Sequence, residues 1–102
     1  SEILRNRRRI MYNGCVVVTV VVDGMGELLR PPTLTAPALL DMDDEAPVDL
    51  AIDAAVEAVR QTPVKGRRDD GILQEAVRRA VRRSLLASTG KKPVTCVQIV
   101  RI

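Results

Sequence analysis

The chain has 102 residues, which suffice for one domain that buries about two-thirds of the surface of its unfolded chain. Apolar residues make up 46% of the sequence, yet Tyr12 is its single aromatic residue and it has no histidine. Few aromatic rings argue against RNA-recognition-motif and OB-fold binders, which stack bases on such side chains. Without histidine, the usual general base and zinc ligand are missing. We therefore expect no catalytic site in this segment.

The net charge of +3 conceals a strong segregation of charge along the chain. Residues 41–60 carry seven acidic side chains and one basic one, whereas residues 61–92 carry nine basic and three acidic ones. The longest apolar stretch, residues 14–22, is too short to span a bilayer, and no secretory signal pattern precedes it. The sequence therefore predicts a cytoplasmic protein with no membrane partner.

The N-terminal part divides into a lead-in and a strand. Residues 1–13 are polar and Arg-rich and are expected to be a basic linker, and residues 14–102 are expected to form one domain. The run CVVVTVVV, residues 15–22, is almost entirely β-branched. Such a run is typical of a central strand that is covered on both faces.

A hairpin is predicted next. Asp23–Gly26 has the Asp-Gly signature of a tight turn, in which glycine supplies a positive φ. The second strand should cover residues 27–34, and Pro31 and Pro32 restrict it to a sheet edge because proline cannot donate to a ladder. Residues 36–46 are expected to form an acidic loop.

Two amphipathic helices and a third strand are predicted in the rest of the chain. Apolar residues at helical spacing indicate a helix over residues 47–61 and another over about 69–88, which Gly90 ends. The segment between them, residues 62–68, contains a proline and a glycine and is expected to be a loop. Residues 94–102 are expected to form the third strand.

The predicted order is ββααβ, an α/β (α+β) domain. Two antiparallel helices over one face of the sheet would return the third strand beside the first and parallel to it. The sequence therefore predicts a three-stranded mixed sheet of order 2-1-3 with both helices on one face.

Most of the side chains that could carry chemistry have ordinary structural interpretations. The acidic run at residues 41–45 lacks the glycine and the last glutamate of a calcium-binding loop. Asp69 and Asp70 directly precede a helix, where aspartate is preferred as a cap. Cys15 and Cys96 lie in apolar strand-like runs and are expected to be buried free thiols. No metal ligand is assigned.

The second predicted helix carries a basic cluster. Its arginines form two rows at i, i+4 spacing and, with a pair just before the helix, are candidates for RNA contact through phosphates. The alternatives are contact with another protein, or a solvated face that Asp49, Asp53 and Glu57 of the first helix partly neutralise. The RNA-contact candidates are Arg78, Arg79, Arg82, Arg83, Arg67 and Arg68.

The sheet provides a second candidate surface. The strand at residues 15–22 is apolar on both faces, and helices on one face leave the other without a cover. A small soluble protein rarely exposes such a patch, so self-association, as in a dimer, or contact with another domain is expected. The self-association candidates are Val16, Val18, Val20, Val97 and Ile99.

Three segments resemble one known family. They are RRRIMYNGCVVVTVVVD at residues 7–23, LQEAVRRAVRRSL at residues 73–85 and GKKPVTCVQIVRI at residues 90–102. In this order they are similar to the C-terminal domain of ribonuclease J, most closely in alphaproteobacterial members. The resemblance covers nearly the whole chain.

The resemblance implies a parent enzyme of the metallo-β-lactamase/β-CASP class, which cleaves RNA with two zinc ions as a 5′–3′ exoribonuclease and endoribonuclease. The H-x-H-x-D-H motif of that class has no counterpart here, so no catalytic residue carries over and no cofactor is expected in this segment. The resemblance also implies a small sheet with two helices, joined to the catalytic body and implicated in oligomer assembly.

We therefore expect a non-catalytic assembly domain acting in RNA processing and mRNA decay, with a second copy and the catalytic body as its partners and RNA as a further candidate. The competing hypothesis is a small stand-alone RNA-binding or ribosome-associated module that uses the basic helix. A third reading, an independent enzyme, has the least support from the sequence.

Overall fold

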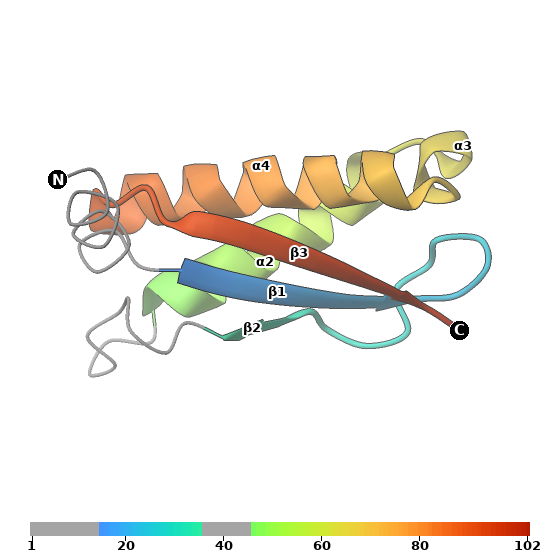
Figure 1. Ribbon diagram of the computed structural model, residues 1–102, viewed down its shortest axis with the longest axis horizontal. Coiled ribbons are helices and arrows are strands. Elements are labelled where there is room, and N and C mark those ends of the chain that lie inside the picture. The colour runs from blue at the N-terminus through green and yellow to red at the C-terminus, as the bar shows by residue number, and fades with distance from the viewer. Residues whose placement is uncertain (1–14, 36–45) are drawn as a thin grey trace, which may run out of the picture.

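The computed structural model describes residues 15–35 and 46–102 (Figure 1). The predicted lead-in and nearly all of the predicted acidic loop lie outside these residues. The described elements follow the order β1 (Cys15–Val22), β2 (Thr33–Thr35), α2 (Ala46–Gln61), α3 (Val64–Arg67), α4 (Asp70–Thr89) and β3 (Val94–Arg101).

The predicted sheet topology is confirmed. The order is β2-β1-β3, with β2 antiparallel and β3 parallel to the central strand β1. The register pairs Val18 with Leu34 on one side and with Val97 on the other. Because paired residues point to the same face of a sheet, this register defines two faces.

The predicted hairpin is only partly correct. The tight turn is present, and the carboxylate of Asp23 accepts hydrogen bonds from the backbone N–H groups of Met25 and Glu27. The positive φ belongs to Gly26, however, with a value of 83°. The second strand lies at the sheet edge as predicted, but its predicted range of 27–34 is too long: an isolated bridge joins Val22 to Leu28, and only the three residues of β2 pair further on. Pro31 and Pro32 lie between this bridge and β2 and interrupt the ladder, because proline cannot donate a backbone hydrogen bond.

The two main helices agree with their predicted ranges and pack against each other. They run in opposite directions along the sheet (Figure 1). The side chain of Asp69 caps α4 by accepting a hydrogen bond from Ile72 N–H, and Gly90 ends it with a left-handed φ of 73°. The predicted loop at residues 62–68 is corrected, because the short helix α3 lies within it.

The core lies between the helices and one face of the sheet. It joins Val16, Val18, Val20 and Val22 of β1 to one buried stripe on each helix. On α4 this stripe is Leu73, Val77, Val81 and Leu85.

Three predicted self-association residues therefore need correction. Val16, Val18 and Val20 are at most 1% exposed, because the chain's own helices cover them. Val97 and Ile99, at the same face on β3, are partly buried and pack against the same core. The face that the described helices leave open is the opposite one.

Candidate functional site

Glu75 lies one turn before Arg78 and Arg79 on α4 and forms ion pairs with both, but with no other arginine of the helix. Arg78 donates to both carboxylate oxygens of Glu75, at 2.9 and 2.6 Å, and Arg79 Nε lies 3.3 Å from one of them. These contacts lower the pKa of Glu75 and raise the pKa of Arg78, in both cases chiefly through the hydrogen bond between the two side chains. Arg78 is thus committed within its own helix.

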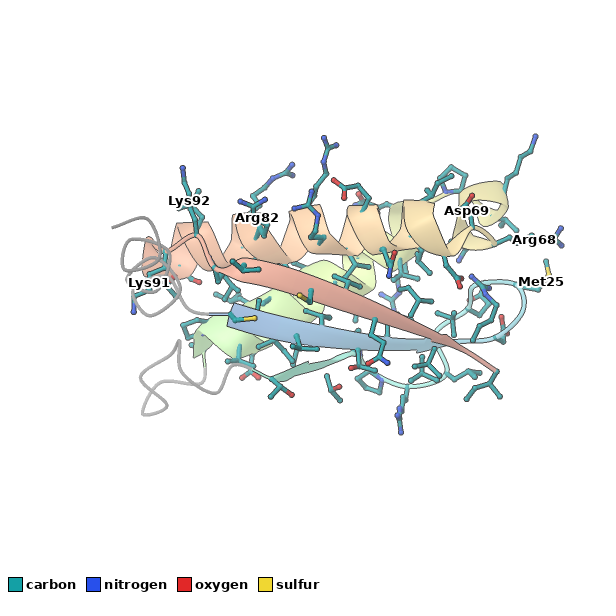
Figure 2. All side chains as sticks on the ribbon, viewed as in Figure 1. Met25, Arg68, Asp69, Arg82, Lys91 and Lys92 are labelled. Carbon is teal, nitrogen blue, oxygen red and sulfur yellow. The ribbon has the colours of Figure 1, made fainter. Side chains whose placement is uncertain are left out.

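Arg67 and Arg68 do not join the α4 cluster. Arg67 forms an ion pair with Glu27 at 3.3 Å, and its side chain is only 14% exposed. Arg68 donates to the sulfur of Met25 at 3.1 Å. Figure 2 shows Arg68 and Arg82 toward opposite ends of α4. The six predicted RNA-contact residues therefore do not form one surface.

The remaining cations line a groove with a residue that the sequence analysis missed. The cationic groove consists of Arg79, Arg82, Arg83, Leu86 and Lys92. The first four follow i, i+3, i+4, i+7 spacing on one side of α4. Gly90 then turns the chain back, and Figure 2 shows Lys92 projecting on the same side as Arg82. A basic residue just past a predicted helix end was the only available sequence signal for Lys92.

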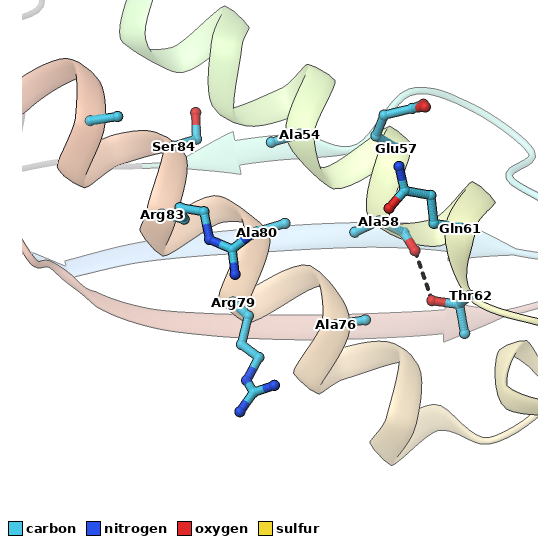
Figure 3. A pocket seen from close by; sticks show the side chains of 11 residues that line it. Ala54, Glu57, Ala58, Gln61, Thr62, Ala76, Arg79, Ala80, Arg83 and Ser84 are labelled. Atoms are coloured by element: carbon cyan, nitrogen blue, oxygen red, sulfur yellow. Dashed lines mark hydrogen bonds between the residues drawn. The ribbon is translucent and has the colours of Figure 1, made fainter.

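The acidic face of α2 forms no ion pair with these cations within the described residues. The ion pairs among the described residues join Arg67 to Glu27, Arg78 and Arg79 to Glu75, and Arg101 to Asp70. None of them involves α2. Glu57 does lie beside a second groove, between α2 and α4, which Arg79 and Arg83 line from the opposite side (Figure 3). Its floor is mainly alanine, and Thr62 donates to the carbonyl of Ala58 at its end.

The open face of the sheet is uncharged throughout its described residues. It combines partly exposed apolar side chains with small polar ones; Val17 is 38% exposed and Val94 is 54% exposed. Val21 is the buried exception, at 5%. By the register of the three strands, this face consists of Cys15, Val17, Thr19, Val21, Thr33, Thr35, Val94, Cys96, Gln98 and Val100.

Both thiols lie on the open face. Cys15 and Cys96 are free, as predicted, but Cys15 is only half-buried and Cys96 is exposed. The prediction of buried thiols is therefore wrong. It failed because it assumed that β1 is covered on both sides.

A zinc site does not fit the described residues. Residues 15–35 and 46–102 contain no group of three or more Cys, Asp or Glu side chains that could hold a metal ion, and the sequence has no histidine. Within the same residues, each helix is too short or too polar to cross a membrane.

The comparison with known families agrees with this architecture. Residues 2–102 match the model of the Ribonuclease J C-terminal domain, and the chain belongs to that family, as the resemblance predicted. A curated relative, Ribonuclease J of Sinorhizobium meliloti, is 41% identical over 98 residues. The aligned region is 94% of this chain but only 17% of the relative.

Proposed function

We propose that this chain is the non-catalytic assembly domain of a ribonuclease J that processes and degrades RNA in the cytoplasm. Two zinc ions and the cleavage chemistry would belong to a catalytic body outside this sequence. Family membership supports the parent enzyme, and the uncharged open face of the sheet is the observation that supports assembly. A second copy of this face is the proposed partner.

A second copy fits the open face for a simple electrostatic reason. In a two-fold interface each surface meets its own equivalent. A face that carried charge would place like charges near one another, whereas this face places apolar and small polar side chains against their equivalents. Burial of Val17 and Val94 then contributes about 25 cal/mol for each Å² of apolar surface removed from water.

The size of the open face sets the expected affinity. At 3.3 Å per residue and 4.8 Å between strands, two eight-residue strands with a short third one span roughly 25 by 15 Å. A stable interface typically buries about 800 Å² on each partner, which is more than this face provides. Self-association of the isolated chain should therefore be weak, with further contacts supplied by the catalytic body.

The proposal is tested by sedimentation velocity on the chain from low micromolar concentrations to about 1 mM, a range suited to a small interface. We expect a concentration-dependent dimer that Val94→Glu or Val17→Glu abolishes. Leu50→Glu is the matched control, because Leu50 on α2 is also 54% exposed but lies off this face. A strict monomer throughout the range, or equal effects of all three substitutions, would refute assembly through this face.

A further inference from the structure

We propose that the cationic groove binds the phosphate backbone of single-stranded RNA without sequence preference. This inference rests on the proposed function for the choice of RNA as the polyanion. It concerns residues away from the open face of the sheet, so the two proposals can fail separately. The proposed site has four cations in place of the six arginines expected from the sequence: Arg79, Arg82, Arg83 and Lys92.

Most cations of the groove are not paired with an acidic group of the described residues. Within residues 15–35 and 46–102, the side chains of Arg82, Arg83 and Lys92 form no hydrogen bond or ion pair with a protein group. Arg79 makes a single contact of 3.3 Å with Glu75 and its side chain remains 73% exposed. The groove thus keeps most of its cationic capacity for an external anion.

The spacing of the arginines on α4 opposes helix stability. Arg78 with Arg82, and Arg79 with Arg83, are like charges at i, i+4 spacing, which destabilise a helix by about 0.2–0.5 kcal/mol for each pair. Cations stabilise a helix when they lie in its last turn, but the last turn of α4 has no basic residue. Ion pairs with Glu75 account for Arg78 and Arg79, but neither an ion pair within the helix nor a place in its last turn accounts for Arg82 and Arg83.

The side chains of the groove indicate which class of anion it binds. Planar guanidinium groups match phosphate oxygens through paired hydrogen bonds, and three of them follow one another along α4 beside Lys92. Leu86 is the sole apolar side chain that lines the groove. Membrane insertion would need a wider apolar surface. The described residues contain no aromatic ring for base stacking, since the only one in the chain is Tyr12, so we expect backbone binding without base readout.

The experiment is fluorescence anisotropy of a labelled 12-nucleotide oligouridylate with the whole 102-residue chain between 25 and 200 mM salt. Neutralising three or four phosphates predicts a slope of log affinity against log salt of about −2 to −3. Oligoadenylate should bind about equally well. Arg82→Gln/Arg83→Gln should weaken binding on the order of tenfold at the lowest salt and reduce the slope by about 1.4.

The matched control is Arg30→Gln/Arg60→Gln, which removes the same charge from exposed positions outside the groove. It should change affinity by less than about twofold, because distant surface charges are screened. Thermal denaturation should show that the groove variant is at least as stable as the wild type, since it relieves two like-charge pairs. The same variants should retain the dimerisation measured by sedimentation.

Three results would overturn the inference. They are a wild type that does not bind the oligouridylate at 25 mM salt, equal weakening in the groove and control variants, and displacement of the RNA by polyglutamate at matched charge concentration. Equal weakening would mean that RNA affinity depends only on the net charge of the chain. Displacement by polyglutamate would mean that the groove binds acidic protein. Loss of RNA binding with intact dimerisation, or the reverse, would show which of the two proposals fails.

Discussion

Arg101, near the end of β3, joins four segments of the chain through one guanidinium group. Its Nε and Nη2 atoms donate to the carboxylate of Asp70 at 3.0 and 2.7 Å, which fastens β3 to the start of α4. Nη1 donates to the carbonyl oxygens of Asp23 at 2.9 Å and Gly24 at 3.3 Å in the turn after β1. Nη2 also reaches the carbonyl of Arg67 in α3 at 2.8 Å. We therefore expect Arg101→Met to loosen this end of the domain.

The expected loss is about 2–3 kcal/mol. Hydrogen bonds with a charged partner contribute about 1.5–3 kcal/mol each when buried. The Arg101 side chain is 24% exposed and its Asp70 partner is 55% exposed, so the ion pair itself adds no more than about 1 kcal/mol. Most of the loss comes from two part-buried backbone carbonyls: that of Arg67 loses its side-chain donor, and that of Asp23 keeps only the N–H of Gly26.

Urea unfolding followed by far-ultraviolet circular dichroism, at one fixed protein concentration, measures this loss. A change of 2–3 kcal/mol should lower the urea midpoint by about 1–2 M and the Tm by about 10–15 °C. Arg101→Lys should fall between the wild type and Arg101→Met, because an ammonium cannot reach all of these acceptors at once. Arg60→Met, on the exposed side of α2, serves as the control. If Arg101→Met cost less than about 0.5 kcal/mol, as an ordinary surface substitution does, the bridging role would be refuted.

Three further predictions test the fold. Gly26→Ala should cost about 2 kcal/mol or more, because φ is positive and a Cβ there would lie 2.8 Å from a backbone oxygen of α3. Gly24→Ala meets no atom within 4 Å and should change stability by less than about 0.5 kcal/mol, so equal urea midpoints for the two variants would contradict this prediction. Leu73→Ala should cost about 3 kcal/mol in thermal or urea unfolding, since its side chain is fully buried, and Ile72→Ala, at 52% exposed, about 1 kcal/mol or less. The pKa of Glu75 is lowered in the folded chain, so its ion pair stabilises the fold above the pH at which a glutamate of the unfolded chain ionises, and this stabilisation is lost as the pH falls through the lower native pKa. Glu75→Gln should therefore reduce the fall of the urea midpoint below about pH 4.3. An unchanged dependence on acid pH would argue against the ion pair.

The topology was predictable because strong local signals agreed with one another. The β-branched run of β1, the cap at Asp69 and the stop at Gly90 located the main elements, and an antiparallel pair of helices between the strands favoured a parallel return of β3. The second strand was predicted too long because its apolar residues outweighed Pro31 and Pro32. Pairing could begin only after the prolines, so the ladder is limited to the three residues of β2.

The assignment of faces failed for a different reason. β1 has valine on both faces, so its periodicity carries no information about which face meets the helices. Thr19 is its one polar residue and has the same parity as Val17, which was the available signal for the open face. Arg101 and Lys92 were missed because their roles depend on chain segments that only the tertiary structure brings together.

The parallel pairing of β1 and β3 also bears on how the domain is made. Each residue of β1 lies 79 positions before its partner in β3. At synthesis rates of about 5–20 residues per second, the valine-rich strand waits roughly 4–16 s on the ribosome before its neighbour exists. During that interval a strand of this composition is prone to aggregation. We therefore expect β1 to depend on cover during synthesis, from a chaperone or from early docking of the two helices that precede β3 in the chain.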